Sequence, residues 1–416
     1  MNENTSIKFD TRIIVLMLLV VIEIMGVGIV FPMLPELFIA KNSIFASIGT
    51  ASESTKHLYY GLSISFWSLG MFLGTPYLGA LSDRFGRKKV FLASLCMTAI
   101  CYGFLAIAIY LKSILFFFIG RILSGFFAGN YELAHAAAAD ISSNSEAKAR
   151  NMGWITFALG IGFVFGPLVT TFTAGKSSIL SLGITTPFWI ASILALGNAW
   201  LIASAFNETF HPKEQNKIIF KKIFSSILFV FIDSRLTYLS FIFFTITCAW
   251  IIFFTGMPLY LADVFNLSTK YIGLFYCVTG LSNAITILAI QKIILKSFSL
   301  RNIVIYTSLL SALALLLLAL VLPLSVVVIL IAIFSIVELL TYSSFLALYS
   351  DAVTTEEQGK AMGGTASLSS LAFIVTSLIT ATLANIHAKL PIILSALLFC
   401  LSGIAVFKIK NSSSKK

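Results

Sequence analysis

An acidic residue lies deep within the first long apolar run, where a carboxylate is tolerated only if it has a task. Glu23 is followed by Gly26, Gly28, Pro32 and Pro35, and it lies roughly 15 Å along a helix from the polar edge of the run. A buried carboxylate whose access to water alternates can bind and release a proton. We hypothesise that Glu23 is a proton-coupling group. The alternative is a structural glutamate held by hydrogen bonds.

The fourth apolar run carries an arginine, which in lipid must face a cavity or a partner. At about 100° per residue in a continuous helix, Gly125, Glu132 and His135 fall near the face of Arg121. We hypothesise that Arg121 and Glu132 join Glu23 in proton coupling, with Arg121 modulating the proton affinity of Glu23. A structural ion pair, or snorkelling at a helix end, is the alternative for both.

The second half of the chain holds a further carboxylate at mid-run. Glu338 and Tyr342 are one helical turn apart, so they share a helix face. We expect this face to line a central cavity. Glu338 is a candidate for binding a cationic substrate or for carrying a second proton, against a structural role. Weaker cavity candidates are Trp250, Asn283 and Gln291, because polar side chains also join helices.

A loop of glycines and charged residues separates the second and third apolar runs. Its notable residues are Gly79, Asp83, Arg84, Gly86, Arg87 and Lys88. Gly79 favours close helix approach, and Gly86 permits a tight turn. The basic residues favour the cytoplasmic face. Asp83 is placed to meet the positive end of a neighbouring helix.

Small residues and a proline mark the fourth and fifth runs. Gly125 precedes Gly162, Gly166 and Pro167. Such residues let helix backbones approach closely within a membrane. We therefore expect these four positions to lie at helix contacts.

The composition requires lipid as the solvent for most of the chain. Hydrophobic residues make up 58% and charged residues 11%, with a mean hydropathy of +0.98, whereas soluble domains carry about 25% charged residues. The net charge of +11 is scattered between apolar runs, which argues against nucleic acid. The five cysteines show no paired spacing, so neither disulfides nor a zinc site is indicated. No H-E-x-x-H or similar constellation suggests an enzyme.

Twelve runs are long enough to cross a membrane as helices. They lie near 13–38, 58–82, 90–111, 114–138, 152–174, 184–206, 236–262, 269–292, 302–322, 324–350, 361–384 and 389–408. The first is longer than the apolar core of a signal peptide, so we expect it to be retained. Most of the 28 Lys and Arg residues lie in loops that share one side, which predicts both termini in the cytoplasm.

The runs divide into two halves, 1–206 and 236–416, around a polar linker at 207–235. Within the linker, 218–232 is apolar but short, and it predicts an amphipathic helix on the membrane surface. The loops after the fourth and tenth runs both end in a Met-Gly pair, at Met152 and Met362. This internal repeat supports two related six-helix units.

The loop from Gly79 to Lys88 resembles the signature G-x-L-x-D-R-x-G-R-K of the major facilitator superfamily, and every position matches. This resemblance implies an all-α fold of twelve transmembrane helices in two pseudo-symmetric six-helix bundles. It further implies that the loop is a conformational latch. Asp83 would contact the start of the eleventh span, near 361–364, in the outward-facing state.

The first half resembles drug/proton antiporters of the tetracycline-exporter type. Glu23 stands where an aspartate is usual, and Gly120 to Gly125 is similar to a second family motif. The fifth run is similar to the glycine-rich motif of exporters, but Thr170 and Thr171 replace its final glycine pair, which weakens that assignment.

The resemblance implies a secondary active transporter of small organic molecules, driven by a proton gradient without a cofactor. Efflux of a drug, siderophore or metabolite is the first expectation, and proton-driven import of a nutrient or iron chelate is the alternative. The expected partners are the small-molecule substrate, protons and the lipid bilayer, without nucleic acid. We expect a monomer in a bacterial inner membrane.

Overall fold

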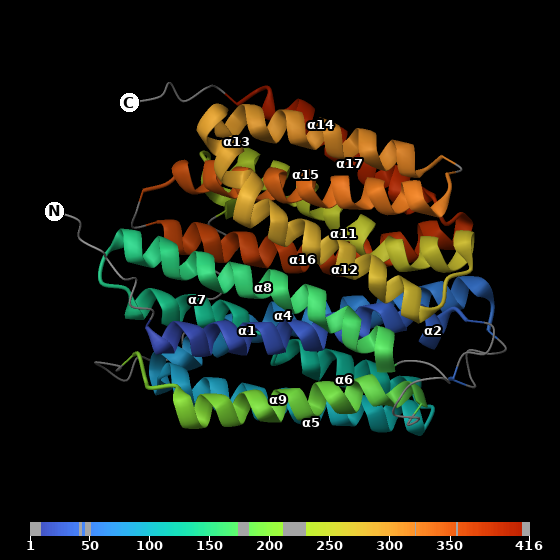
Figure 1. Cartoon of the computed structure of the whole chain (residues 1–416), viewed down its shortest axis with the longest axis horizontal. Coiled ribbons are helices and arrows are strands. Elements are labelled where there is room, and N and C mark those ends of the chain that lie inside the picture. The colour runs from blue at the N-terminus through green and yellow to red at the C-terminus, as the bar shows by residue number, and fades with distance from the viewer. Residues whose placement is uncertain are drawn as a thin grey trace.

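The chain folds into a bundle of long helices in a computed structural model (Figure 1). The structure describes residues 10–40, 44–45, 51–173, 183–210, 230–320, 322–354 and 357–409. Helices dominate because each unpaired backbone group in lipid costs several kcal/mol, and a helix pairs these groups within one segment.

Among the described residues, the first half of the chain contributes eight helices and two short 3-10 turns. The helices are α1 (Thr11–Val30), α2 (Leu34–Phe38), α4 (Glu53–Phe85), α5 (Arg87–Tyr110), α6 (Ile114–Phe126), α7 (Asn130–Ile141), α8 (Ser145–Thr173) and α9 (Thr186–Ala205). Polar caps start several of them: Asp10, Ser52 and Ser113 accept bonds from backbone N–H groups of the first turn. Gly86, at φ +94°, ends α4 and lets α5 begin at once.

The second half contributes α11 to α17. They are α11 (Thr237–Phe265), α12 (Thr269–Ile285), α13 (Gln291–Ser297), α14 (Leu300–Leu318), α15 (Leu324–Asp351), α16 (Gln358–Ile386) and α17 (Leu390–Val406). A π-helical turn, Thr286–Ile290, joins α12 to α13 so that the two form one long span.

The predicted spans are found in the structure with modest shifts of their ends. Eleven helical segments of the described chain are long and apolar enough to cross a membrane. The twelfth predicted span is the shorter apolar helix α17, whose 17 residues reach the lower limit for crossing. The prediction of a polytopic all-α protein is therefore confirmed.

The fourth span differs from its prediction in one respect that matters for the site. It is not one continuous helix, because α6 ends at Phe126 and α7 begins only at Asn130. The residues between them leave the helical path without a proline. The expectation of one continuous helix from Arg121 to His135 is therefore wrong, and the helical spacing used to place these residues on one face does not apply across the break.

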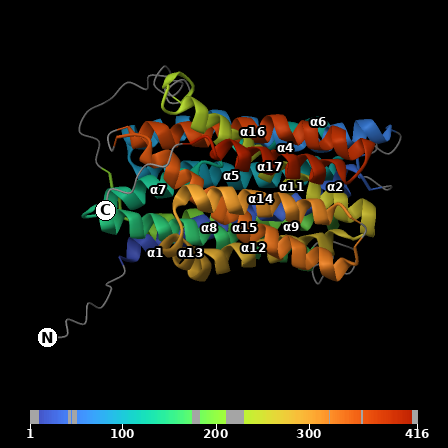
Figure 2. The same cartoon turned by 90° about the horizontal axis from the view of Figure 1, so that it is seen from above.

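The helices form two groups that lie side by side along the long axis of the molecule. Figure 1 shows the first group in blue and green below the second group in yellow to red, with α4 and α8 next to α16 and α12; Figure 2 shows the same arrangement from above. The domain limits 1–206, 207–235 and 236–416 stay predictions. The amphipathic helix expected at 218–232 lies almost wholly outside the described residues, of which only 230–232 are helical.

One end of the molecule, here called the Phe38 end, is where α2 ends and where α4 and α12 begin; the opposite end is called the Phe85 end. At the Phe38 end α4 packs tightly against α16. A Cβ placed on Gly61 would lie 2.8 Å from the Cβ of Ala381. The Tyr60 hydroxyl donates to the Thr255 carbonyl at 2.5 Å, and Ser65 donates to the Ile374 carbonyl at 2.9 Å.

The second contact between the groups joins α8 to α12. A Cβ on Gly280 would lie 2.7 Å from Val164, and Gly273 faces the Pro167 carbonyl in the same way. Thr171 donates to the carbonyls of Pro167 and Lys270, at 2.9 and 3.1 Å. Thr171, one of the two threonines that replace the expected glycine pair, therefore bonds across the two groups.

Glycines bring α4 and α6 unusually close together. A Cβ on Gly125 would overlap the Trp67 carbonyl, and Cβ atoms on Gly70 and Gly74 would overlap carbonyls of α6. Backbones at this separation gain packing contacts that a side chain would prevent.

We expect Gly125→Val to destabilise the folded protein by about 1–3 kcal/mol, because the added side chain has no room between α4 and α6. The lowering would be measured as a fall in the thermal unfolding midpoint in detergent. Gly197→Val on α9 is the matched control, because Gly197 is exposed and a Cβ there meets nothing within 4 Å. Equal midpoints for the two variants would contradict the packing account.

Candidate transport site

An aromatic cluster closes the space between the two helix groups on the Phe38 side. Phe31, Trp67 and Phe163 come from the first group, and Trp250, Phe254, Tyr276 and Phe373 come from the second. Phe254 lies at its centre, with ring centroids 5.1 Å from Phe31, 6.0 Å from Phe163 and 5.0 Å from Trp250. We call these seven residues the aromatic seal.

The seal separates the middle of the molecule from a large hollow at the Phe38 end. That hollow has a volume of about 1290 Å³ and is lined by α2, α4, α8, α11, α12 and α16. Next to it, the Thr269 hydroxyl donates to the Glu36 carboxylate and ties α12 to α2. Five hydrogen bonds and the edge-to-face contact of Trp67 with Phe373 join the two groups on this half of the molecule, within the described residues. The structure is thus closed at the Phe38 end.

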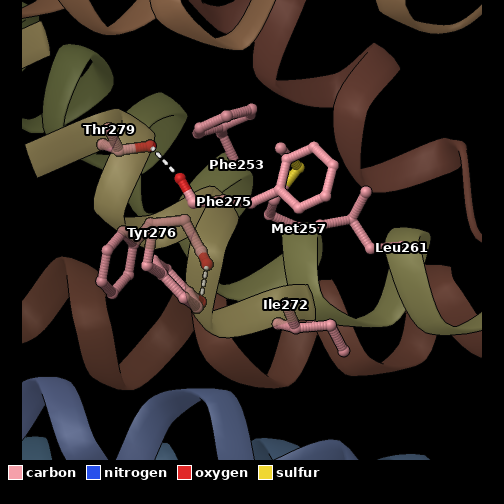
Figure 3. Close-up of a pocket in the computed structure, with 8 residues that line it drawn as sticks. Phe253, Met257, Leu261, Ile272, Phe275, Tyr276 and Thr279 are labelled. Atoms are coloured by element: carbon pink, nitrogen blue, oxygen red, sulfur yellow. Dashed lines mark hydrogen bonds between the residues drawn. The ribbon is translucent and has the colours of Figure 1, made fainter. Parts of the chain in front are cut away.

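A second, much smaller cavity lies between α11 and α12 (Figure 3). Its volume is about 10 Å³, and Phe253, Met257, Phe275 and Tyr276 are among the side chains around it. A space of this size holds at most one water. It is therefore a packing defect next to the seal rather than a substrate site.

Glu23 lies on α1 in the middle of the molecule and is held by the start of α7. Its Oε1 atom accepts a hydrogen bond from the backbone N–H of Asn130 at 3.2 Å. Its Oε2 atom is buried and has no hydrogen-bond partner. One oxygen is thus anchored while the other is available to a proton, as a proton-coupling carboxylate requires.

The break in the fourth span is what makes this bond possible. A residue inside a continuous helix donates its N–H to the carbonyl four residues before it, whereas the first N–H groups of a helix are unpaired. Asn130 is the first residue of α7, so its N–H is available to Glu23. The positive end of α7 also points toward this carboxylate.

Asn130 itself is fixed by a small polar network and is fully buried. The Ser94 hydroxyl of α5 donates to its Oδ1 atom, and its side-chain amide donates to the Phe127 carbonyl at 3.5 Å. The network joins α5, the break and α1. It was not predicted from the sequence.

Arg121 lies apart from Glu23, nearer the Phe38 end. It is 2% exposed, donates from Nε to the Ser63 carbonyl at 2.9 Å, and stacks over Trp67 of the seal at 5.6 Å. Its NH2 group has no hydrogen-bond partner, and none of the ion pairs among the described residues includes it. The structure therefore does not bring Arg121 and Glu23 into direct contact.

The two groups of helices bring carboxylates toward each other across the middle of the molecule. Glu132 is on α7 and Glu338 is on α15, where it is 5% exposed. The Tyr342 phenol interacts electrostatically with both of them. Within the described chain neither carboxylate takes part in an ion pair. Two unpaired acids beside a phenol can bind a cation or hold protons.

The weaker cavity candidates are distributed over different elements. Trp250 belongs to the aromatic seal, with its ring 5.9 Å from Phe373. Asn283 on α12 has a buried Oδ1 atom without a hydrogen-bond partner. Gln291 begins α13, beyond the π-helical turn and toward the Phe85 end. Only Trp250 is in contact with the residues described above.

The predicted helix-packing residues of α8 lie against α1. A Cβ on Gly162 would be 2.7 Å from the Cβ of Ile24, and one on Gly166 would be 2.7 Å from the Met25 carbonyl. The Pro167 ring in turn packs against Gly28. These contacts hold α1, and therefore Glu23, close to α8.

The signature loop is bound to its own helix group in this state. Arg87 pairs with Asp83 at 2.7 Å and with Asp140 at the end of α7 at 3.0 Å. Asp83 remains 62% exposed. The contact of Asp83 with 361–364, which is expected in the outward-facing state, stays a prediction. At Gly79 a Cβ would meet nothing within 4 Å, so this glycine makes no close helix contact here.

Glu208, after α9, holds the start of α5 and was missed in the sequence. Its carboxylate accepts from the backbone N–H groups of Arg87 and Lys88, at 2.8 and 3.1 Å. A Cβ on Gly86 would overlap it, which explains the glycine. Arg84 is not part of this cluster and stacks over its neighbour Phe85.

Comparisons with known proteins agree with this architecture. A tetracycline resistance protein of class B from Escherichia coli is 28% identical over 51% of this chain and 47% of its own length. The class C protein from Escherichia coli is 35% identical over 45% of this chain and 42% of its own length. Multidrug resistance protein 2 of Bacillus subtilis (strain 168) is 27% identical over 50% of this chain and 47% of its own length. The chain spans less than half the length of these curated relatives.

Solved structures share the fold over nearly the whole chain. The human organic anion transporter MFSD10 (TETRAN) covers 95% of this chain and 99% of its own, with a TM-score of 0.73 and 21% identity. A D-xylose-proton symporter covers 96% of this chain and 97% of its own, with a TM-score of 0.75 and 18% identity.

The family model described as Major Facilitator Superfamily matches residues 16–377. This match extends over both helix groups and includes the signature loop, Glu23 and Glu338. The chain is therefore a multi-pass membrane protein that belongs to the Major Facilitator Superfamily, a family of transporters rather than enzymes.

Proposed function

We propose that this protein exports small organic molecules in exchange for protons, by alternating access, in a bacterial inner membrane. The observation that carries the proposal is Glu23, a mid-membrane carboxylate with one anchored oxygen and one unpartnered buried oxygen. The names of the curated relatives, tetracycline and multidrug resistance proteins, support efflux. No cofactor is required, because the proton gradient supplies the energy.

The distribution of basic residues supports an orientation for the structure. Arg87 and Lys88 begin α5 at the Phe85 end, and basic residues between two spans favour the cytoplasm. The Phe38 end then faces outward. Because the contacts between the bundles are concentrated at this outer end, we interpret the conformation as inward-facing, and we propose that the protein acts as a monomer.

The proposed cycle follows from this state. Glu23 releases its proton to the cytoplasm, and substrate enters between Glu132 and Glu338. The two bundles then rock, so that the aromatic seal opens and the Phe85 end closes. Substrate leaves outward, a proton from outside binds Glu23, and the protein returns. One proton moves inward for each substrate molecule that moves outward.

The signature loop has a task in the outward-facing state. Asp83 is exposed here and free to approach the start of α16 when the Phe85 end closes. Its carboxylate would there meet the positive end of a helix. The open space around Gly79 would be used in the same movement.

We expect Glu338→Gln to lower export of an organic cation such as ethidium by roughly tenfold, the cost of about 1.4 kcal/mol of lost charge attraction. A neutral compound such as chloramphenicol should be affected much less, because Gln keeps the shape of the side chain. The measurement is efflux rate from preloaded cells, with Glu53→Gln on the exposed outer end as control. Equal losses for both compounds would show that Glu338 is structural.

The direction of transport is tested with membrane vesicles of both orientations. An exporter accumulates substrate in everted vesicles when their interior is acidified, and does not accumulate it in right-side-out vesicles energised in the physiological direction. The importer remains the second candidate, because Thr170 and Thr171 replace the glycine pair that is typical of exporters. Accumulation in right-side-out vesicles alone would establish import and overturn the proposal.

A further inference from the structure

The short helix α7 connects three features of the molecule that the proposed cycle uses separately. Its first residue, Asn130, donates its backbone N–H to Glu23. Glu132, in its first turn, faces Tyr342 of the other bundle. Asp140, near its last residue, pairs with Arg87 of the signature loop. The first and last of these contacts are ten residues apart, about 15 Å along the helix.

A non-helical segment separates α7 from the neighbouring helix at each of its ends. The break after Phe126 separates it from α6, and Ser142 to Asn144 separate it from α8. Its buried face consists mostly of small side chains: Ala134, Ala137 and Ala138 are fully buried, and Leu133 is a larger apolar side chain packed beside them. A short helix with a break in the helical path at each end can shift as one body, because its movement does not require α6 or α8 to bend.

The contact at the start of α7 depends on the charge of Glu23. A hydrogen bond to a carboxylate is about twice as strong as one to a neutral acceptor, and a charge at the positive end of a helix adds its own attraction. Protonation of Glu23 weakens both. The position of α7 is therefore sensitive to the same proton that drives the cycle.

We propose that Asn130 is a positioning residue for Glu23, and that α7 transmits the protonation of Glu23 to the ion pair between Asp140 and Arg87 in the signature loop. This inference rests on the proposed role of Glu23. It adds the physical connection by which loading of a proton at mid-membrane reaches the latch at the Phe85 end.

Several other groups surround Glu23 and bear on its response to pH. Glu132 of α7 and Tyr102 of α5 interact with it electrostatically, and Arg121 acts on Tyr102. From α8, Gly162 packs against Ile24 and Val21 of α1, and from α9 Asn198 donates to the Leu19 carbonyl of α1. Glu132 is the one further carboxylate among these groups, so its variant Glu132→Gln has to be measured in parallel.

The test uses the full-length protein with its native cysteines replaced and spin labels at Lys89→Cys on α5 and Ser143→Cys just after α7. Both positions are exposed and lie beside the latch. Pulsed electron double resonance gives the distance between the labels at acid and alkaline pH. We expect a pH-dependent change in this distance, lost in Glu23→Gln, which should give the acid-state distance at every pH. Glu132→Gln should keep the change.

Asn130→Pro and Asn130→Ala form the matched pair that isolates the backbone donor. Proline is tolerated at the first position of a helix but lacks an N–H, whereas alanine keeps it. Asn130→Pro should therefore fix the acid-state distance, and Asn130→Ala should retain the response to pH. If Asn130→Pro does not fold, the comparison of Glu23→Gln with the parent protein still decides.

An unchanged distance in Glu23→Gln, equal to that of the parent at alkaline pH, would overturn the inference. Transport assays separate this result from a failure of the proposed function. Loss of proton-driven transport in Glu23→Gln with α7 unmoved refutes only the connection through α7. A pH-dependent α7 in a protein whose Glu23→Gln variant transports normally refutes only the proton-coupling role.

Discussion

Glu23→Gln should abolish substrate accumulation driven by a pH gradient while leaving downhill exchange of substrate intact. Gln has nearly the same shape as Glu and can still accept the N–H of Asn130, but it cannot carry a proton across the cycle. With one proton per substrate, a gradient of one pH unit supports roughly tenfold accumulation, because each pH unit is worth about 1.4 kcal/mol per proton. In the variant the accumulation ratio should fall to about one.

The measurement is accumulation in proteoliposomes with an imposed pH gradient, alongside counterflow without a gradient. Glu53→Gln is the matched control, since Glu53 is an exposed glutamate at the Phe38 end and lies far from the seal. Full gradient-driven accumulation by Glu23→Gln would remove Glu23 from the coupling mechanism. Loss of counterflow as well would mean that the variant is damaged more generally.

Locking the Phe38 end shut should stop transport completely and reversibly. Gly61 and Ala381 face each other across α4 and α16, with a Cβ separation of 2.8 Å when a Cβ is placed on Gly61. Disulfides span Cβ separations of about 3.5–4.5 Å, so a shift of an ångström or less allows Gly61→Cys and Ala381→Cys to bond. Alternating access requires these helices to separate, and a covalent bond prevents it.

The double cysteine variant is made in a background without Cys96, Cys101, Cys248, Cys277 and Cys400. Substrate flux is measured after oxidation and again after reduction, with each single cysteine variant as control. We expect flux at the level of empty liposomes after oxidation and recovery after reduction. Undiminished flux from a fully cross-linked protein would show that the two bundles do not part at this end.

The order and position of the spans could be predicted because hydropathy measures how well a segment is accommodated in lipid, and this also determines which segments form membrane-spanning helices. A segment such as Leu324–Asp351 must be both long and apolar to satisfy its backbone in lipid, and both properties are written in its composition. The break between Phe126 and Asn130 could not be predicted in this way. It contains no proline and continues an apolar run, so hydropathy does not change across it, and the only local signal is the low helix propensity of Gly129 and Asn130.

The candidate site was only partly predictable for a related reason. Glu23, Glu132 and Glu338 attract notice because charged groups are rare in lipid. Asn130 does not, because the atom that holds Glu23 is a backbone N–H, and backbone donors leave no trace in a sequence. The position of Arg121 relative to Glu23 depends on where each lies along its own helix, and the position of Glu132 relative to Arg121 depends on the break between α6 and α7.

Glu208 shows what signal could have been used. It follows the sixth span, as part of the sequence Asn207 to Thr209, and its acidic side chain lies among basic loops. A carboxylate beside a helix that starts with Arg87 and Lys88 is favoured both by charge and by the free N–H groups of that helix. A search for acidic residues near the ends of spans that could bind the first N–H groups of helices with basic first turns would have suggested this contact.

The most direct test of the account is the proton released when substrate binds to the purified protein. Addition of tetracycline or ethidium to the protein in weakly buffered detergent solution should release about one proton per bound substrate molecule. The Glu23→Gln variant should bind the substrate without releasing a proton. Equal proton release by the parent protein and Glu23→Gln would contradict the claim that Glu23 exchanges its proton for substrate.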